Sequence, residues 1–307
     1  MAIVTSSPAA LVVFTPDPAR IIGQWDFNSL DLSATCGRDL EYFDGNVQAG
    51  TSFGDSDFLG AGLIDGQIAN IMSFPGATPT PTGGYKMRHG LTGTGGGSNV
   101  NQYTLIMDVY YPGEADRTVR TLLQTDPTNA NEGDFRINEN NGLGVSGVFD
   151  GNIQSNTWYR IALAFDLVGP GPNPIVAKFI NGVKVGQQVL SEGRDGRWSL
   201  SASADAPWAL LFADNDSDAQ RGYVNSIQLR AGRLSDVAIA AMGGPKASKI
   251  PGAACVVVMG GNLLIRWSGT ILESANEVTG PWNPIVGATN PYQVPTPLAG
   301  RKFYRAR

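Results

Sequence analysis

A period-two spacing of apolar side chains constrains this chain more than any other feature. It is clearest in YTLIMDVYY, residues 103–111, and in WYRIALAFD, residues 158–166. Successive side chains of an extended strand point to opposite faces, so alternate residues share one face. The side chains expected on a common buried face are Tyr103, Leu105, Met107, Val109 and Tyr111 in the first stretch, and Tyr159, Ile161, Leu163 and Phe165 in the second.

Turn residues divide the remaining strand-like segments. IVAKFINGVKVGQQVL, residues 175–190, places Asn181-Gly182 between two β-rich runs. That dipeptide adopts positive φ angles easily, so it predicts a tight β-hairpin. WALLFAD, residues 208–214, and YVNSIQLR, residues 223–230, predict another strand pair with an acidic loop between them.

One short helix is expected within LSDVAIAAMGG, residues 234–244. Ser235 can accept hydrogen bonds from the free amides of the first turn, and Leu234 and Ile239 stand at the hydrophobic-staple positions. Gly243 suits the left-handed helix end. Long helical periodicity is absent elsewhere, while 39 glycines and 19 prolines provide many turns. The predicted fold class is therefore all-β, with the strands arranged as an antiparallel sandwich.

The 307 residues are enough for two domains. GGPKASKIPGAA, residues 243–254, has the small residues, glycine and proline of a linker. We therefore expect a large domain at 21–245 and a small β module at 246–307. Residues 1–20 are expected to be a lead-in or a tag-derived segment.

Charge and hydropathy exclude several classes of partner. The formal net charge is −5 and no basic run occurs, so nucleic acid is not expected as a partner. No segment has the roughly 20 apolar residues needed to insert into and span a membrane. The only cysteines, Cys36 and Cys255, match no metal or redox spacing. They can form a disulfide, although two thiols are the simpler interpretation.

The run from YTLIMDVYYP through NTWYRIALAFD and KFINGVKVGQ to GRLSDVAIAAMGGP resembles laminin G-like domains, and more broadly the concanavalin A-like jelly-roll superfamily. The tail from LLIRW to KFYRAR resembles a small immunoglobulin- or fibronectin-like module of secreted bacterial multidomain proteins. The resemblance implies a jelly-roll β-sandwich followed by a smaller sandwich. It also implies an extracellular or cell-surface location, glycan or protein binding, frequent calcium, and other domains in a longer parent protein.

Two acidic loops can supply the six to eight oxygen ligands that calcium prefers. They are TDPTNANEGD, residues 125–134, and DNDSD, residues 214–218. The second is no EF-hand, because Ala219 and Asn225 stand where that loop needs glycine and glutamate. Aspartate and asparagine are also common turn residues, so a loop without a metal is the alternative. The candidate metal ligands are Asp126, Asn129, Asn131, Asp134, Asp214, Asp216 and Asp218.

The same acids can in principle catalyse glycan hydrolysis as a pair. Asp134 with Asp214, or Glu139 with Asp150, are the pairs considered, and their separation is left open. The chain has no E-x-D-x-x-E motif and a single histidine, His89, outside any Q-x-H setting. Both departures from the enzymatic jelly rolls favour a protein without catalysis.

The glycine-rich stretch 80–102 and two tryptophans are the candidates for ligand contact. The stretch carries Tyr85, Lys86, Arg88 and His89 and can form the edge of a ligand site, although a surface crossover is the alternative. Trp198 and Trp208 flank a loop-like segment, and an exposed indole can stack on a sugar ring. The expected ligand-binding residues are Tyr85, Arg88, His89 and Trp198.

The leading hypothesis is a secreted, lectin-like accessory module that binds an extracellular polysaccharide or a cell-surface glycan and is stabilised by calcium. A polysaccharide hydrolase or lyase with a divergent acid pair is the alternative from another class. A structural or adhesion spacer without a small ligand is the third.

Overall fold

The computed structural model describes residues 20–76, 83–169, 173–216, 218–252, 254–259, 262–295 and 302–307. The predicted lead-in, residues 1–20, lies outside the described residues except for Arg20, where the first strand begins. The chain divides into a larger compact unit, Pro18–Ile250, and a smaller one that contains Pro251–Arg307.

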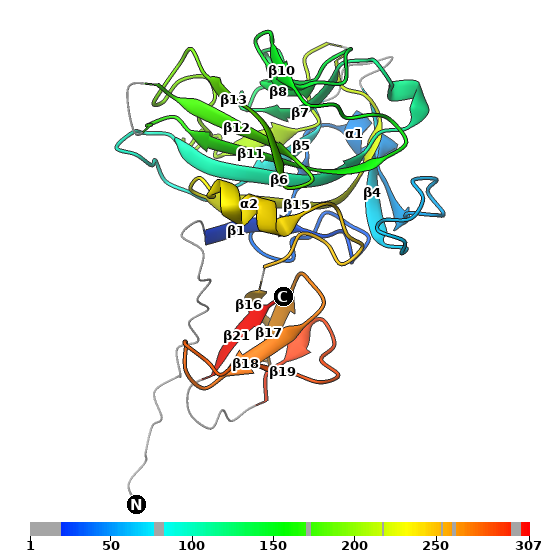
Figure 1. The fold of residues 1–307 in the computed structure, drawn as a ribbon, viewed down its shortest axis with the longest axis vertical. Coiled ribbons are helices and arrows are strands. Elements are labelled where there is room, and N and C mark those ends of the chain that lie inside the picture. The colour runs from blue at the N-terminus through cyan, green and yellow to red at the C-terminus, as the bar shows by residue number, and fades with distance from the viewer. Residues whose placement is uncertain are drawn as a thin grey trace, which may run out of the picture. The chain divides into compact units, whose positions relative to one another are not determined.

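Two antiparallel sheets stacked face to face build the larger unit (Figure 1). Among the described residues, one sheet has eight strands in the order β13-β12-β11-β6-β15-β4-β3, with β1 also pairing with β15, and the other has seven in the order β10-β9-β8-β7-β14-β5-β2. The first sheet contains β1 (Arg20–Trp25), β3 (Ser52–Asp55), β4 (Asn70–Phe74), β6 (Gln102–Tyr110), β11 (Trp158–Asp166), β12 (Ile175–Ile180), β13 (Val183–Val189) and β15 (Gly222–Ala231). The second contains β2 (Glu41–Tyr42), β5 (Tyr85–Arg88), β7 (Arg120–Gln124), β8 (Phe135–Ile137), β9 (Leu143–Val145), β10 (Val148–Asp150) and β14 (Trp208–Leu211).

The main hydrophobic core lies between these sheets and confirms the predicted all-β sandwich. Alternate residues of β6 and β11 enter it, including Leu105, Met107, Ile161 and Leu163. The opposite face of the eight-stranded sheet is also buried, because Ile106 and its neighbours pack beneath a helix. Period-two spacing therefore identified the inner face correctly, while the outer face is covered as well.

That helix, α2 (Asp236–Met242), is the one predicted from sequence, and it lies along the outer face of the eight-stranded sheet (Figure 1). The Ser235 hydroxyl accepts a 3.2 Å hydrogen bond from the Ala238 amide, and Gly243 ends the helix with φ of 59°. Two shorter helical segments are α1 (Gly45–Gly50) and η1 (Gly113–Ala115). No helix among the described residues is long and apolar enough to cross a bilayer.

The predicted hairpin is present and the second predicted strand pair is not. Asn181 and Gly182 have φ angles of 51° and 80° and connect β12 to β13. In contrast, β14 pairs with β5 and β7, whereas β15 pairs with strands of the other sheet. The acidic loop between them therefore carries the chain from one sheet to the other. Alternation in sequence indicates a strand but not its partner, which explains the wrong pairing.

The predicted linker packs against the larger unit up to Ile250. Ile250 joins the small cluster under α2, and Lys249 is buried beside it. The Lys249 ammonium donates hydrogen bonds to the Asn225 carboxamide oxygen at 2.8 Å and to the backbone carbonyl of Asn70. This buried lysine anchors a segment whose composition is that of a linker.

The smaller unit has two three-stranded sheets among its described residues, β16-β17-β20 and β19-β18-β21. Trp267 lies in its core. Trp282 is partly exposed, and the Arg305 guanidinium lies 4.5 Å from the centre of its ring. The strands are β16 (Ala254–Met259), β17 (Asn262–Trp267), β18 (Leu272–Ala275), β19 (Asn283–Pro284), β20 (Tyr292–Gln293) and β21 (Phe303–Ala306).

Neither cysteine of the chain is a free thiol. Cys36 and Cys255 are both disulfide-bonded. The simpler interpretation from sequence, two thiols, is therefore wrong. The spacing of cysteines in a sequence does not by itself decide whether they are oxidised.

Candidate functional site

The two acidic loops predicted from sequence lie side by side in the structure. The Asn129 side-chain amide donates a 2.9 Å hydrogen bond to the backbone carbonyl of Asp214. The Gly133 amide donates to the Asp214 carboxylate at 3.2 Å, and the Asn215 side chain donates to the Ala130 carbonyl at 3.2 Å. Residues of the β7–β8 and β14–β15 connections therefore form one cluster.

Three carboxylates gather where these loops meet. One oxygen from each of Glu132, Asp214 and Asp218 lies within 4.8 Å of the others. Arg136 extends into the group, with Nη1 at 3.3 Å from Glu132 Oε2 and 3.1 Å from Asp218 Oδ2. Three negative charges thus face one guanidinium. Oxygens at this spacing can share one calcium ion, whose Ca–O distances are about 2.3–2.6 Å.

Asp214 is the residue most affected by this crowding. Burial, together with the charges of Asp216, Glu132 and Asp218, raises its pKa to about 6 against hydrogen bonding from the Asn215 amide. Burial and the Asp216 charge also raise the pKa of Asp218. A carboxylate that is costly to ionise in the free protein would be stabilised by a bound cation.

Asp126 and Asn131, both expected metal ligands, close their own loop. The Asp126 carboxylate accepts hydrogen bonds from the Thr128 amide at 2.9 Å and from the Asn131 side chain at 2.8 Å. Burial opposes ionisation of Asp126, but the hydrogen bonds from Thr128, Ala130 and Asn131 outweigh it and lower its pKa. The bond from the Thr128 amide gives Asp126 the geometry of an Asx turn, which Asn131 supports with its side chain.

Asp134 is likewise engaged elsewhere. It is buried, and its carboxylate contacts Arg197 Nε at 2.5 Å and the Thr125 amide at 2.6 Å. Burial raises its pKa against those hydrogen bonds. Asp134 and Arg197 form one wall of a pocket of about 390 Å³ that also includes Asp126 and Asn131, and both charged groups of that wall are paired.

The remaining two predicted ligands lie beside the carboxylate cluster. Asp216 accepts a 3.0 Å hydrogen bond from the Asp218 amide, so it shapes the loop. The side-chain oxygen of Asn129 is buried and has no hydrogen-bond partner, while its side-chain nitrogen donates to the backbone carbonyl of Asp214. Of the seven predicted ligands, Asp214 and Asp218 are in the cluster, and Glu132 was missed.

The expected ligand-contact residues of the β5 region are largely structural. Tyr85 is 1% exposed, and its hydroxyl lies 2.6 Å from Thr51 Oγ1 inside the core. His89 is also buried; its Nδ1 accepts from the Leu91 amide and its Nε2 lies 2.9 Å from the Ser201 carbonyl. These contacts define a neutral ring with the proton on Nε2, and burial lowers its pKa. Tyr85 is therefore corrected to a core position and His89 to a buried one.

Trp198 is corrected in the same way, because it is 3% exposed and packs in the main core. Arg88 does reach the surface, where it forms a two-pronged ion pair with Glu41 at 2.6 and 3.1 Å. Its guanidinium also lies 4.5 Å from the ring of Trp208. Arg88 therefore contacts Glu41 and Trp208 within the protein, and the face of the Trp208 ring is covered by a guanidinium.

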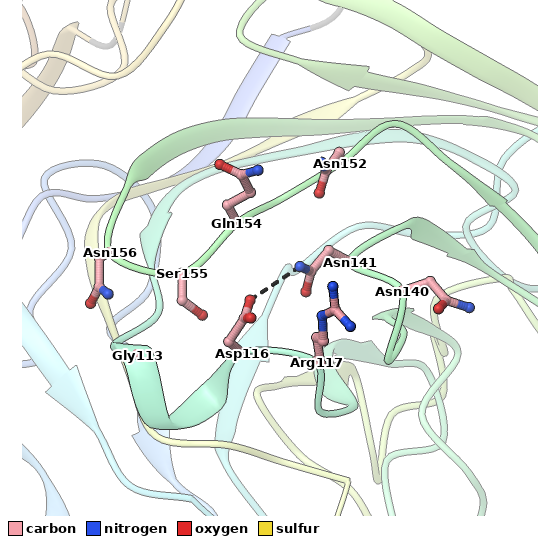
Figure 2. Close-up of a pocket in the computed structure, with 9 residues that line it drawn as sticks. All are labelled: Gly113, Asp116, Arg117, Asn140, Asn141, Asn152, Gln154, Ser155 and Asn156. Carbon is pink, nitrogen blue, oxygen red and sulfur yellow. Dashed lines mark hydrogen bonds between the residues drawn. The ribbon is translucent and has the colours of Figure 1, made fainter.

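A second pocket, not predicted from sequence, has a different character. It measures about 490 Å³ and lies where η1, the turn between β8 and β9, and the connection from β10 to β11 meet. Figure 2 shows the two amide-bearing stretches facing each other across it. Amide, hydroxyl and charged side chains dominate the lining: Gly113, Asp116, Arg117, Asn140, Asn141, Asn152, Gln154, Ser155 and Asn156. We call this the amide pocket.

The base of the amide pocket is held rigid by Asn141. Its side-chain nitrogen donates to Asp116 at 3.1 Å, the bond drawn in Figure 2, and its oxygen accepts from Arg120 at 2.5 Å. Arg120 is fully buried and also donates to the Ile153 carbonyl at 3.3 Å. The pocket base is thus a fixed polar surface.

Other lining groups are available to a ligand. No hydrogen bond of the described residues involves the side-chain amides of Asn140, Asn152 or Gln154, which are exposed. The Ser155 hydroxyl is buried and has no partner. A planar amide offers both donors and an acceptor, so it can bind two neighbouring hydroxyls of one sugar ring. The lining contains no aromatic side chain.

The sequence holds a signal for this pocket, although a weak one. NENN, residues 138–141, and GNIQSN, residues 151–156, are the amide-rich stretches that line it. Such stretches are usually turns, and Asn141 and Asn156 do adopt positive φ angles. The two stretches form a site only because the tertiary structure brings them to the same pocket.

Comparison with known proteins gives distant structural likenesses alone. No family model matches the chain, and no curated protein matches it. Domain 4 of AbnA, an extracellular GH43 arabinanase from Geobacillus stearothermophilus, in complex with arabinotriose, is similar at 20% identity over 73% of this chain and 98% of that chain, with a TM-score of 0.41.

Two further solved structures show similar likenesses. The CBM40 of the Ruminococcus gnavus IT-sialidase, bound to α2,3-sialyllactose, has 14% identity over 48% of this chain and 84% of that chain, with a TM-score of 0.35. The binding domain of Paraclostridial Mosquitocidal Protein 1 has 10% identity over 92% and 72%, with a TM-score of 0.45. These similarities are too distant to assign a ligand to this chain.

Proposed function

We propose that this chain is a carbohydrate-binding module whose amide pocket holds part of a polysaccharide or cell-surface glycan. The observation that carries the proposal is a pocket of about 490 Å³ lined by unpaired amides on a rigid base. Sugar hydroxyls are donors and acceptors at once, which matches such a lining. Without a stacking aromatic, we expect modest affinity for a single sugar.

The number and position of the carboxylates favour a binding function over hydrolysis. Asp116 is the only acid among the residues that line the amide pocket, whereas most glycosidases need two acids facing the substrate. The raised pKa of Asp214 beside Asp218 favours the hydrolase alternative. Asp214 is fully buried, however, and a general acid must reach its substrate. Release of reducing ends, abolished by Asp214→Asn, would support that alternative.

The proposal includes one structural calcium, held by Glu132, Asp214 and Asp218. Their oxygens fit the spacing calcium requires, and two of the three negative charges are left over after pairing with Arg136. The unpartnered oxygen of Asn129 lies on a neighbouring residue of the same loop. Calcium there would hold the β7–β8 and β14–β15 connections together.

An extracellular or cell-surface location is part of the same proposal. Both cysteines are disulfide-bonded, and disulfides persist mainly in oxidising compartments. Polysaccharides and cell-surface glycans are found outside the cell. In a longer parent protein, such a module would hold a neighbouring domain near its substrate, which raises effective concentration.

A glycan array followed by calorimetry on the positive glycans tests the proposal. The double variant Asn152→Ala/Gln154→Ala should lose most binding because two hydrogen-bonding amides are removed. The matched control, Gln48→Ala/Gln67→Ala, removes two exposed amides outside the pocket and should bind like the wild type. Blank arrays and blank polysaccharide pull-downs would refute the proposal and favour a spacer.

A further inference from the structure

We infer that the amide pocket selects glycans that carry a carboxylate, namely uronic or sialic acid residues, and that Arg117 contacts that group. This inference rests on the proposed function and specifies its ligand class. It starts from the charged side chains in the pocket lining and directly beneath it.

Arg117 is the first positive charge. It lines the pocket, is exposed, and stands in the short connection between η1 and β7 with φ of 53°. No hydrogen bond or ion pair of the described residues involves its guanidinium. Surface arginines elsewhere in the unit, such as Arg88 and Arg136, are paired with acids. Arg117 is therefore free to bind an anion.

Arg120 is the second positive charge, and it lies beneath the pocket base. Its guanidinium is fully buried and donates to three neutral oxygens, on Asn141, Ile153 and Thr118. No carboxylate forms an ion pair with it among the described residues. A buried charge without a direct counter-ion keeps its field in the low-dielectric interior, so it attracts anions to the pocket above.

Asp116 is the one negative charge in the lining, and it interacts electrostatically with the buried Arg120. With Arg120 beneath the lining counted, two guanidinium groups and one carboxylate leave one positive charge among these three side chains, in a chain whose formal net charge is −5. Asn141 joins Arg120 to Asp116 through its oxygen and nitrogen, which directs Asp116 toward the pocket base. The excess positive charge is thus left to Arg117.

A sugar carboxylate matches this arrangement in shape as well as in charge. The planar guanidinium can donate two parallel hydrogen bonds to the two oxygens of a carboxylate. The amides of Asn152 and Gln154 are then available for the ring hydroxyls. A neutral sugar would use the amides and leave Arg117 hydrated.

Matched pairs of ligands test the inference by calorimetry. Oligogalacturonate is compared with the same oligomer after reduction of its carboxylates to alcohols, and sialyllactose with lactose. We expect at least tenfold tighter binding of one carboxylated ligand, because a hydrogen bond to a charged group contributes roughly 1.5–3 kcal/mol. The preferred pair distinguishes a uronic acid within a polymer from a terminal sialic acid. Added salt should weaken the charged ligand more than its neutral partner.

Arg117→Gln should remove that preference, and Arg117→Lys should restore part of it. Arg194→Gln is the matched control, because Arg194 is an exposed arginine outside the pocket. Thermal unfolding should be unchanged in all three variants, which separates ligand contact from a structural role.

Each other outcome is decisive. Equal binding of carboxylated and reduced ligands, lost in Asn152→Ala/Gln154→Ala, would overturn this inference and leave the glycan-binding function in place. Binding of sulfated glycans alone would overturn the carboxylate assignment. Absence of binding to every glycan would overturn both proposals.

Discussion

The side-chain amide of Asn129 and the backbone carbonyl of Asp214 are 85 residues apart in sequence and 2.9 Å apart in space. This hydrogen bond makes two acidic loops one structure. It also explains why Asp214 is buried and crowded, because Glu132 of the first loop reaches the same place as Asp218 of the second. The cluster therefore belongs to both connections.

Calcium should raise the unfolding temperature of the protein. A ligand at one hundred times its dissociation constant adds about 2.7 kcal/mol, and at about 2–4 °C per kcal/mol for a domain of this size this is a rise of roughly 5–11 °C. Asp214→Asn should abolish the rise, because it removes a charged ligand from the centre of the cluster. Asp205→Asn, which neutralises an exposed aspartate elsewhere, should keep it.

Differential scanning fluorimetry after chelation, with calcium then added back, measures these shifts. Metal analysis of the untreated protein distinguishes an empty site from one too tight to strip. Wild-type protein that contains no calcium and shows no shift would contradict the proposed site.

The raised pKa of Asp214 predicts how stability depends on pH without calcium. Its carboxyl ionises near pH 6 in the folded protein and near 3.8 when unfolded, so the folded state holds the extra proton between these values. Raising the pH through this window should therefore lower the free energy of unfolding, by up to about 3 kcal/mol. Calcium affinity should rise over the same window, because proton and metal compete for one carboxylate.

Urea unfolding of the wild type and of Asp214→Asn from pH 4 to pH 7.5 measures this effect. Because other acids titrate in both proteins, the difference between the two curves isolates Asp214. A difference that does not vary with pH would show that Asp214 ionises normally.

The fold could be predicted from the sequence because strand periodicity, the Asn181-Gly182 turn and the Ser235 helix cap are local signals. The core of a sandwich follows from alternation, and the structure confirms it at Leu105 and Leu163. The assignment of β14 and β15 to different sheets could not be predicted, since a strand's partner depends on packing over the whole domain.

The site residues were harder to predict from the sequence. Trp198, Tyr85 and His89 have residue types common in ligand sites, but sequence carries no reliable measure of burial for an aromatic in an irregular stretch. Glu132 was missed because it stood outside the aspartate and asparagine pattern. The amide pocket requires three connections to meet, which only the tertiary structure determines.

Asn141 should be the most stability-sensitive residue of the amide pocket. Asn141→Gly keeps the left-handed backbone, at φ of 64°, but removes the oxygen that Arg120 donates to. A buried donor left without its acceptor costs roughly 1–3 kcal/mol, more when charged. Asn140→Gly is the matched control, and its effect should stay within about 0.5 kcal/mol because the side chain is exposed. Equal urea midpoints for the two variants would argue against a supporting role for Asn141.

Lys249 should stabilise the segment that precedes the smaller unit, in a manner that depends on pH. Its ammonium donates to Asn225 Oδ1 at 2.8 Å and to the carbonyls of Asn225 and Asn70. Lys249→Met would leave these oxygens buried without a donor, so we expect a loss of about 1–3 kcal/mol. Limited proteolysis should then cut within residues 243–250 faster than in the wild type.

The pH dependence follows from the pKa of Lys249, which burial lowers from 10.5 to about 8 although the charges of Asp26 and Asp108 oppose this. Between these values the unfolded chain carries a proton that the folded protein lacks, so unfolding takes up a proton. Raising the pH therefore disfavours unfolding, and the wild type should gain stability relative to Lys249→Met between pH 8 and pH 10. Urea unfolding of both proteins at pH 7.5, 8.5 and 9.5 gives the difference. A difference that stays constant across these pH values would mean that Lys249 keeps its charge in the fold.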